Sequence, residues 1–430
     1  MQSTRYGMVQ GTVNGRGGRV ALWLALGISL ALLGFFKYFN FFADSAVRTL
    51  NALGFDASPF TLQILLPVGI SFFTFQAIAY TIDVYWGRET AQKNFWLFAL
   101  YVSYFPQLVA GPIERSTHLI PELRKWRVVT SPMFYSACQL ILIGYFKKVF
   151  IADGVAPMVT RCFTEADLSG LALLCGMYLF ALQIYGDFAG YTDIARGVSR
   201  LFGIELCLNF RQPYFSANIT EFWRRWHISL SSWLRDYLYI PLGGSHNGPT
   251  RTYLNNMITM LLGGLWHGAN WTFVVWGGLH GFYLAVHKFL LGDKKTVSWS
   301  PFEGRREQNR IAYFLRSLRW LVCVLCTFHL VCFAWIFFRA DTISQAFDYI
   351  NRIIHFYQTG RGGFMVMLAY VLFYYFWAGL VDLLCVCQKS EVPFTTKWPS
   401  PVRGFAYALM IILMIFIGAS DVQPFIYFQF

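Results

Sequence analysis

The stretch LLGGLWHGANWTFVVWGGLHG, residues 261–281, decides the fold class. It is mostly apolar, long enough to span a bilayer, and rich in glycine and tryptophan, so it predicts one membrane helix. His267 lies in the middle of that helix, where an ionisable side chain is costly and usually has a function. The alternative is a histidine satisfied by packing against a neighbouring helix, and we favour the functional interpretation.

The neighbours of His267 add two expectations. Asn270 follows it by three residues, so on a helix the two side chains share a face and Asn270 can orient the imidazole ring. Gly263, Gly264 and Gly268 leave this part of the helix without side-chain bulk, so another backbone or a ligand can approach closely.

The composition extends the membrane interpretation to the whole chain. Of 430 residues, 56% are hydrophobic and 13% are charged, and the mean hydropathy is +0.45. Apolar runs recur along nearly the whole length. The sequence therefore predicts an all-α, polytopic integral membrane protein with roughly 8 to 11 transmembrane or re-entrant helices.

The net charge of +13 fits basic cytoplasmic loops beside anionic lipid headgroups. The basic residues are scattered between spans without an arginine-rich arm, which argues against nucleic-acid binding. Some of them can hold an anionic substrate or a phosphate-bearing acyl donor. The nine cysteines lie mostly inside apolar runs, without the spacing of metal ligands, so we predict no metal site.

Other apolar runs predict the remaining spans. The run 20–36 follows a polar leader, 1–19, and lacks a small-residue cleavage site, so it is read as an uncleaved helix. The run 62–84 contains Gln76 and Asp83, which we expect to face the protein interior. Proline and glutamine interrupt the run 95–110, which predicts a broken or partial span. Further spans are predicted at 132–151, 168–189, 320–338, 364–386 and 405–418, and a basic cytoplasmic loop at 287–319.

The end of the run 168–189 leads into GDFAGYTD, residues 186–193. Two acids, Asp187 and Asp193, and two glycines at a membrane boundary indicate a helix end that opens onto a polar cavity. An ordinary solvated cap explains the same residues equally well.

The segment 218–241, NITEFWRRWHISLSSWLRDYLYIP, differs from the other runs because it is heavily charged. Asn218 and Glu221 form a capping box at its start. Its periodicity places apolar side chains on one helical face, and Arg224, His227, Ser231 and Arg235 on another. The segment either lies flat on the membrane surface, which the periodicity favours, or is re-entrant and lines a polar funnel.

These residues limit the possible chemistry. The sequence contains neither a GxSxG elbow for a nucleophilic serine nor an HExxH zinc motif. Acid–base chemistry centred on histidine remains, in which an incoming hydroxyl group loses its proton to an imidazole. A proton-coupled transporter also uses intramembrane acids and histidines, and the residues alone do not separate the two classes.

Six motifs in order along the chain resemble the membrane-bound O-acyltransferase family, in particular the bacterial branch that acetylates alginate and related exopolysaccharides. The likeness runs from Ala21 to Phe430. The motifs are FFTFQAIAYTIDVYWG (72–87), YFPQLVAGPIER (104–115), DFAGYTDIARG (187–197), FWRRWHISLSSWLRDYLYIPLGG (222–244), GGLWHGANWTFVVWGGLHG (263–281) and PFIYFQF (424–430).

The resemblance implies an α-helical fold around a central tunnel. It implies catalytic roles for His267 of the WHG motif, for His227 of the WRRWH motif, and for an acidic residue that we place at Asp193. It also moves the segment 218–241 from the membrane surface to a re-entrant position. To the cavity or the donor-binding site we assign Asn270, Arg224, Arg225, Arg235, Asp187 and Trp266.

The resemblance further implies an activity. An acetyl group passes from a cytoplasmic thioester donor, acetyl-CoA, across the bacterial inner membrane to a polysaccharide hydroxyl group, reached through periplasmic acetyltransferase partners. No bound cofactor is expected. The alternatives are acetyl or D-alanyl transfer to peptidoglycan, teichoic acid or a lipid, and an export component without chemistry.

The domain organisation follows from the same comparison. We expect a polar leader, 1–19, and a single membrane domain, 20–430. Family members usually begin with one or two hydrophobic segments before the region matching KYFNFF (37–42), and here only the run 20–36 precedes it. We therefore expect the sequence to be either truncated at its start or a shortened variant of the family.

Overall fold

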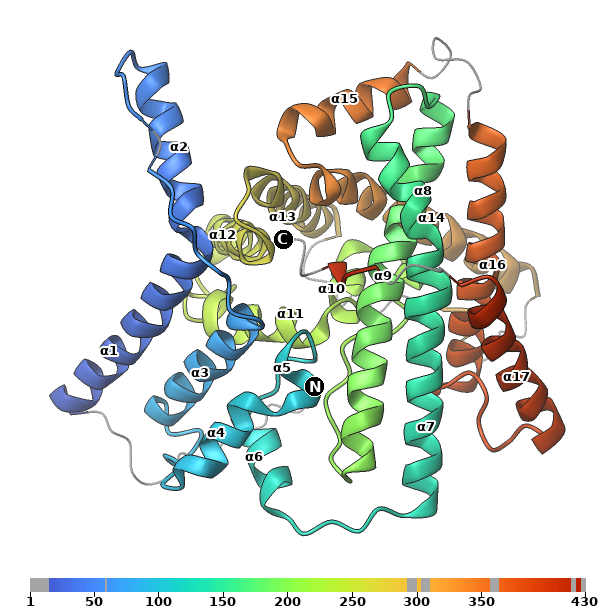
Figure 1. Cartoon of the computed structure of the whole chain (residues 1–430), viewed down its shortest axis with the longest axis horizontal. Helices are drawn as coiled ribbons and strands as arrows, with labels where there is room; N and C mark the ends of the chain where they lie inside the picture. Colours follow the sequence, from blue (N-terminus) through green and yellow to red (C-terminus); the bar gives the residue numbers. More distant parts are fainter. Residues whose placement is uncertain are drawn as a thin grey trace. The chain divides into compact units, whose positions relative to one another are not determined.

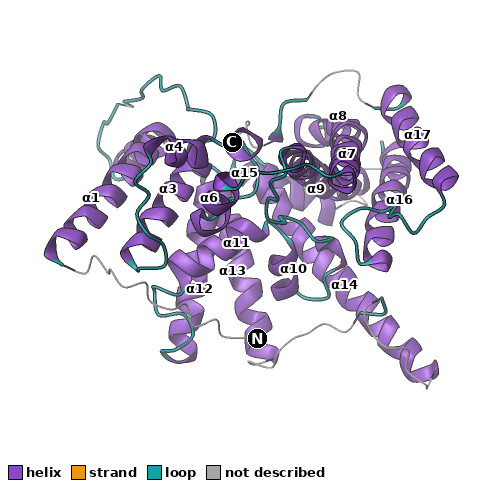
Figure 2. Cartoon of the chain, turned by 90° about the horizontal axis from the view of Figure 1, so that it is seen from below, coloured by secondary structure: helices purple, strands orange, loops and turns teal. Residues whose placement is uncertain are grey.

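The structure is a computed structural model that describes residues 15–58, 60–291, 300–302, 310–355, 363–418 and 423–426. Within these ranges every regular element is a helix and none is a strand, as Figure 2 shows. The all-α prediction is confirmed. The predicted leader lies largely outside the described residues.

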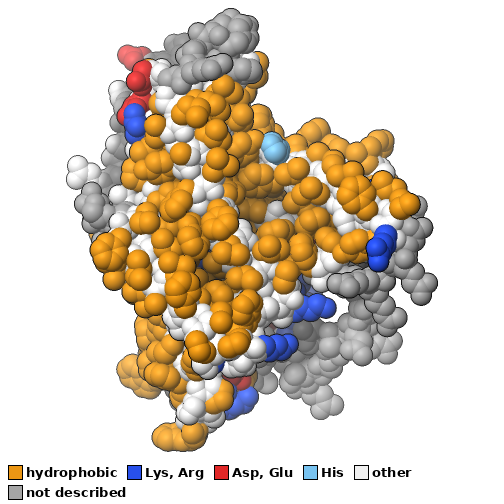
Figure 3. Space-filling view, turned by 90° about the vertical axis from the view of Figure 1, so that its right-hand side faces the viewer, with side chains coloured by type: hydrophobic (Ala, Val, Ile, Leu, Met, Phe, Trp, Pro, Cys, Tyr) orange, Lys and Arg blue, Asp and Glu red, His pale blue; other side chains and the backbone are white. Residues whose placement is uncertain are grey.

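Four helical stretches are long and apolar enough to cross a membrane: Arg16–Ala52, Gly170–Leu201, Arg310–Arg339 and Phe364–Gln388. A shorter apolar helix is Ser400–Phe416. Figure 3 shows a face covered mostly by hydrophobic side chains, with few charged groups. An apolar surface of this extent requires lipid rather than water around it, so the protein is a polytopic membrane protein.

The chain forms two compact units. The first comprises Met1–Met133 and Val198–Cys207, and the second comprises Phe134–Gly197 and Leu208–Phe430. The prediction of a single domain over 20–430 stays a prediction.

In the first unit, α1 (Arg16–Leu33), a π-helical turn (Gly34–Tyr38) and α2 (Phe39–Ala52) run on without a break, so the helix predicted at 20–36 extends at both ends (Figure 1). The next helix, α3 (Ile70–Tyr85), begins later than predicted, directly after Gly69, whose backbone is left-handed with φ at 76°. Gln76 and Asp83 are both buried, which confirms the inward polar face.

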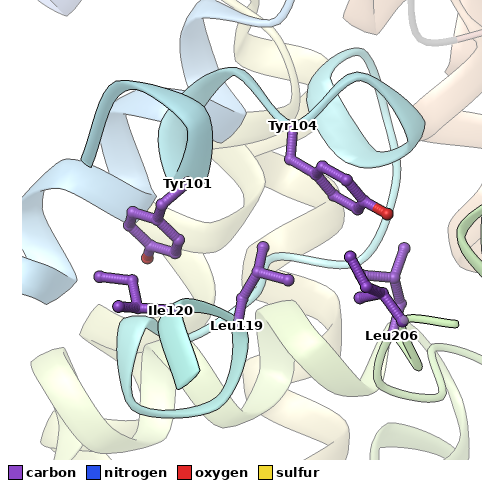
Figure 4. Close-up of a cluster of buried hydrophobic side chains, with 6 residues drawn as sticks. Tyr101, Tyr104, Leu119, Ile120 and Leu206 are labelled. Atoms are coloured by element: carbon purple, nitrogen blue, oxygen red, sulfur yellow. The ribbon is translucent and has the colours of Figure 1, made fainter. Parts of the chain in front are cut away.

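The interrupted run 95–110 is indeed broken. It forms α4 (Phe95–Ser103) and α5 (Phe105–Leu108), separated at Tyr104. With α6 (Ser116–Arg124), these helices enclose a buried cluster of tyrosine and aliphatic side chains (Figure 4). The cluster consists of Tyr101, Tyr104, Leu119, Ile120, Ile204 and Leu206. Burial of such side chains contributes about 2 kcal/mol each, so the cluster holds the short helices together.

In the second unit, α7 (Ser131–Tyr145), a π-helical segment (Phe146–Ala152) and α8 (Asp153–Thr164) follow one another directly. The helix α9 (Gly170–Leu201) then runs for 32 residues, well past the end predicted at 189. Both interpretations of residues 186–193 as a helix end are therefore wrong.

The glycines of that stretch have another use. A Cβ atom on Gly190 would lie 2.7 Å from the Gly144 carbonyl oxygen, and one on Gly186 would lie 2.9 Å from that of Lys147. Their absence of side chains lets α9 approach the backbone of the preceding helical segment closely. Asp187 and Asp193 are therefore positioned in the middle of a packed helix.

The remaining helices are α10 to α13, described below, and α14 (Arg310–Arg339), α15 (Ile343–Ile354), α16 (Phe364–Gln388) and α17 (Ser400–Phe416). The helices α14 and α16 confirm the spans predicted at 320–338 and 364–386. The helix α17 forms at the span predicted at 405–418 but is shorter than the four spanning stretches. The predicted loop 287–319 falls partly in α13 and α14, and its residues 292–299 and 303–309 lie outside the described ranges.

Candidate active site

Residues 261–281 form two helices, not the one that we predicted. The helix α12 (Gly248–His267) ends at His267, and α13 (Trp271–Leu291) begins four residues later. Gly268 between them is extended, with φ at −159° and ψ at 149°. His267 therefore lies at a helix terminus.

The break also changes the interpretation of Asn270. Its carboxamide oxygen accepts a hydrogen bond from the backbone N–H of Thr272, and its Nδ2 donates to the Asp341 carbonyl oxygen over 2.8 Å. These bonds cap α13 and tie it to the chain beyond α14. The predicted shared helical face with His267 is wrong, because no helix joins the two residues.

The close approach predicted from the glycines is confirmed. A Cβ atom on Gly264 would lie 2.2 Å from the Phe273 carbonyl oxygen, and one on Gly277 would lie 2.2 Å from the Met260 carbonyl oxygen. Each of these contacts leaves no room for a Cβ atom, so only glycine fits at residues 264 and 277, and α12 and α13 pack backbone to backbone close to His267.

The ring of His267 is buried among aromatic side chains and is only 4% exposed. Trp266 and Trp276 each lie with ring centroids 5.1 Å from it, and Phe338 of α14 lies at 5.3 Å. All three rings meet the imidazole at steep angles, which is a favourable edge-to-face arrangement. Three elements thus fix the orientation of this histidine.

The segment 218–241 is not one amphipathic helix. It forms α10 (Ile219–Arg225), α11 (Ile228–Leu234) and a π-helical turn (Arg235–Tyr239). The predicted cap at Asn218 is confirmed, since its side chain accepts from the N–H of Glu221 over 2.8 Å. The apolar face is buried as its period predicts, in the side chains of Phe222, Trp226, Leu230, Trp233, Leu234 and Tyr237.

His227 lies at the junction of α10 and α11 and is completely buried. Its backbone is left-handed, with φ at 42°, an uncommon conformation for a residue with a side chain. The ring therefore does not share the predicted polar face with Arg224 and Arg235, which are exposed. The turn directs His227 into the protein.

The two histidines of the WRRWH and WHG motifs come together. The ring centroids of His227 and His267 lie 6.3 Å apart, at an interplanar angle of 58°. Phe188 of α9 meets the His227 ring edge to face at 4.7 Å, and Phe210 lies at 6.4 Å. The central feature of the site is this pair of imidazoles and the aromatic rings around them. We call those rings the aromatic enclosure; they belong to Phe188, Phe210, Trp266, Trp276 and Phe338.

Asn209 supports His227 and was missed in the sequence. Its Oδ1 lies 3.1 Å from the Nδ1 of His227 and accepts hydrogen bonds from both the backbone N–H and the hydroxyl of Ser229. In the sequence, Asn209 is only a polar residue before Phe210 in a short connector. A connector has no helical periodicity that would indicate which way the Asn209 side chain faces.

A cavity of about 510 Å³ lies beside the aromatic enclosure and shares Phe210 with it. Four cationic side chains line it against two carboxylates. They are Lys147, Arg211, Arg225 and Lys389, with Asp193 and Glu391. The excess of positive charge makes the cavity suited to an anionic ligand.

Asp193 lies on the wall of this cavity. Its carboxylate is 2.7 Å from the ammonium group of Lys147. Arg225 also lines the cavity and pairs with Glu221 at 2.7 Å. Arg224 and Arg235 do not line the cavity, and Arg235 bonds to its neighbour Asp236.

Asp187 joins α9 to the last described residues. One carboxylate oxygen lies 2.7 Å from the ammonium group of Lys148, and the other accepts the backbone N–H of Ile426 over 2.6 Å. Lys148 also donates to the Gln423 carbonyl oxygen and to Asp153. Phe425 packs on Phe188, so this anchor reaches the enclosure around His227.

The arrangement favours proton transfer and acyl chemistry. Two buried imidazoles can accept and donate a proton, while the cationic cavity can hold a phosphate-bearing molecule close by. Within the described ranges, no three histidine, cysteine, aspartate or glutamate side chains group closely enough to hold a metal ion.

Comparison with known proteins identifies relatives of this chain. The profile of MBOAT, the membrane-bound O-acyltransferase family, matches residues 93–292, which include both histidines. The chain is 38% identical over 437 residues to the probable alginate O-acetylase AlgI of Pseudomonas putida. This alignment covers 95% of this chain and 84% of the relative. It is 44% identical over 329 residues to the probable alginate O-acetylase AlgI of Azotobacter vinelandii.

That second alignment covers 75% of this chain and 61% of the Azotobacter relative, so the chain spans about three fifths of that protein. The peptidoglycan O-acetyltransferase of Helicobacter pylori is 36% identical over 368 residues, which are 77% of this chain and 64% of the relative. From these matches and the motifs, the chain belongs to the membrane-bound O-acyltransferase family.

Proposed function

We propose that the protein is a membrane O-acetyltransferase. It takes acetyl groups from a cytoplasmic thioester donor, acetyl-CoA, and passes them across the bacterial inner membrane for O-acetylation of an exopolysaccharide such as alginate. The observation that carries this proposal is the buried pair of His227 and His267, with ring centroids 6.3 Å apart.

The names of the relatives supply the substrate class. Alginate O-acetylases from two genera match most of this chain, one of them along 95% of it. Both histidine motifs fall in the region that matches the family profile. The similarity supports the same acyl acceptor, an alginate-type polymer, for this protein.

In the proposed reaction, His267 is the acid–base centre and His227 assists it. An imidazole removes the proton of an acceptor hydroxyl group, and the hydroxyl oxygen attacks the thioester carbonyl carbon. The carbon–sulfur bond breaks, and the thiolate leaves with the proton that the imidazole returns. The aromatic enclosure excludes water, which protects the thioester from hydrolysis.

The cationic cavity is the proposed donor site. Arg211 and Lys389 line it beside the ion pairs of Lys147 with Asp193 and of Arg225 with Glu221. The two cations, Arg211 and Lys389, can bind phosphate groups of acetyl-CoA through charge-assisted hydrogen bonds. Periplasmic acetyltransferase partners pass the acetyl group on to the acceptor outside the membrane, as the resemblance to the family implies. Asp193 holds Lys147 in place within this site.

The test is His267→Ala in cells that make the polymer. We expect acetyl ester on the secreted polymer to fall at least 100-fold while the protein still reaches the membrane. His329→Ala is a matched control, because His329 is exposed and bonds to the Leu325 carbonyl oxygen of its own helix. Normal acetylation in His267→Ala would refute the proposed function, and loss of export with acetylation intact would favour a transporter.

The second candidate function is transfer to peptidoglycan, favoured by the 36% identity to the Helicobacter enzyme over 77% of this chain. Teichoic acid D-alanyltransferases also match, as in Streptococcus thermophilus at 30% identity over 55% of the chain. The ester content of each envelope polymer in the His267→Ala strain separates these acceptors, since only the true one loses its ester.

A further inference from the structure

We propose that Asn209 is a positioning residue that holds His227 in the tautomer with the proton on Nδ1, which leaves Nε2 as a proton acceptor. The reaction in which Nε2 acts rests on the proposed function. The tautomer itself rests only on the hydrogen bonds around Asn209.

The orientation of the Asn209 carboxamide is fixed by its donors. The backbone N–H of Ser229 points to Oδ1 over 3.2 Å, and the Ser229 hydroxyl donates to the same oxygen over 2.9 Å. A carboxamide turned by 180° would place an NH₂ group against a backbone N–H, two donors facing each other. The atom that faces His227 is therefore the oxygen.

The tautomer follows from that orientation. Nδ1 of His227 lies 3.1 Å from this oxygen, and a carbonyl oxygen cannot donate a hydrogen bond. Nδ1 must carry the proton of the contact. In a neutral imidazole the lone pair then resides on Nε2, which is the atom able to remove a proton from a hydroxyl group.

The Nε2 atom is also the atom that the protein leaves available. It is buried and has no hydrogen-bond partner within the described part of the chain. A buried polar atom without a protein partner is costly, and a catalytic role is one of the explanations for such an atom. The Nδ2 atom of Asn209 also lacks a hydrogen-bond partner among the described residues, and Asn209 is completely buried.

Few charges act on His227. The rings in contact with it belong to Phe188, Phe210, Trp266 and His267, of which His267 alone titrates. On α9, the acid next to Phe188 is Asp187, which Lys148 neutralises. On α10, Glu221 and Arg225 neutralise each other. The Asn209 contact is thus the main polar control on the ring.

Asn209 also shapes the backbone at this point. Its carbonyl oxygen accepts the N–H of Ile228 over 2.9 Å, while its side chain holds Ser229. The residue therefore secures the turn in which His227 is left-handed. A useful test must separate this structural part from the effect on the ring.

The first test observes the tautomer directly. Nitrogen-15 NMR of protein labelled at histidine, in lipid bilayers, reports which ring nitrogen carries the proton, and the loss of a signal in His227→Gln assigns it. We expect a protonated Nδ1 and an unprotonated Nε2 at neutral pH. A protonated Nε2 with a bare Nδ1 would overturn the inference without any reference to activity.

The second test uses Asn209→Asp and measures acetyl transfer against pH. The carboxylate still accepts from Ser229 and His227, so the turn is kept, but its charge stabilises the protonated ring. As the pH is lowered, we therefore expect the variant to lose activity at a pH that is about one unit or more above the pH at which the parent loses it. An unchanged pH profile would mean that Asn209 has a structural role alone.

Asn209→Leu removes the acceptor altogether. We expect kcat to fall about 10- to 100-fold with little change in KM, because Asn209 acts through the ring and not on the substrate. The matched control is Asn255→Leu, which removes another buried asparagine whose Nδ2 bonds to the Gly244 carbonyl oxygen. Equal losses in kcat for the two variants would contradict the positioning role.

The outcomes separate this inference from the proposed function. If the parent protein transfers no acetyl group, the function fails and the NMR result still decides the tautomer. If the parent is active and His227→Gln is inactive, but Asn209→Asp keeps the parent profile, only the inference fails.

Discussion

The ammonium nitrogen of Lys147 lies 2.7 Å from a carboxylate oxygen of Asp193, and both side chains are mostly buried on the wall of the cationic cavity. Asp193→Ala leaves the charge of Lys147 without this partner. We expect a loss of roughly 3 kcal/mol in stability, the low end for a buried pair because a cavity adjoins it. Thermal unfolding of the purified protein in detergent measures the loss.

The control for this pair is the exchanged double variant, Lys147→Asp with Asp193→Lys. It restores opposite charges, so most of the stability should return. Acetyl transfer should not return, because the donor site then has its charges in the wrong places. Full stability of Asp193→Ala alone would show that the pair is not important for the fold.

Gly264→Ala is expected to separate α12 from α13. The new Cβ atom would lie 2.2 Å from the Phe273 carbonyl oxygen, a backbone atom that cannot rotate away. We expect a loss of roughly 3 kcal/mol and a loss of activity, because His267 lies at the end of the displaced helix. Gly278→Ala is the control, since its Cβ atom meets only Leu261 at 3.4 Å, and it should change stability by less than about 1 kcal/mol.

His118 gives the first unit a pH-dependent contact. The imidazole of His118 donates a hydrogen bond to the Glu114 carboxylate, which raises the pKa of His118 above its ordinary value of 6.5, while partial burial acts in the opposite direction. The Glu114 carboxylate is itself buried and also accepts the backbone N–H of Cys207. The contact stabilises the fold fully at pH values below the pKa of His118 in the unfolded chain. Its contribution is lost as the pH rises through the higher pKa that His118 has in the folded protein.

His118→Gln should therefore unfold at a lower temperature than the parent at acidic pH, and the difference should shrink as the pH rises. The effect should not exceed about 2 °C, because the His118 side chain is 47% exposed and solvent screens the pair. High salt should reduce it further. A difference that grows towards alkaline pH would contradict this assignment.

Asp187→Ala should release the segment 423–426. The carboxylate accepts the backbone N–H of Ile426 and pairs with Lys148, so its loss frees that amide. We expect hydrogen exchange of the segment to become about tenfold faster, which corresponds to one charge-assisted hydrogen bond. Asp153→Asn is the control, because Asp153 also bonds to Lys148 but does not contact Ile426. Equal exchange in the two variants would show that Asp187 is not the anchor.

The sequence predicted the fold class and singled out His267 because both depend on local signals. Apolar runs of membrane length are visible in any window, and Gln76 and Asp83 stand out in such a run. The family resemblance implied a catalytic role for each histidine, His227 and His267, and the structure places their rings 6.3 Å apart.

The helix boundaries near the site were harder to predict, because they depend on contacts between segments. The break after His267 had one local signal, Asn270, a residue type that often begins a helix, but the unbroken apolar pattern around it outweighed that signal. Past residue 189, α9 packs closely through Gly190 against Gly144, a contact that no pattern within the run shows. Asn209 acts on His227 across 18 residues, so its role required the fold.

The site also has a consequence for how the protein is made. The helices α10 and α11 have seven residues each, too few to be stable alone, so the turn that carries His227 requires packing from elsewhere. The enclosure of His267 includes Phe338 of α14, synthesised well after both histidines. The ribosome must therefore deliver α14 to the membrane before the acid–base pair is complete, and a nascent chain that stops earlier carries both histidines without a finished site.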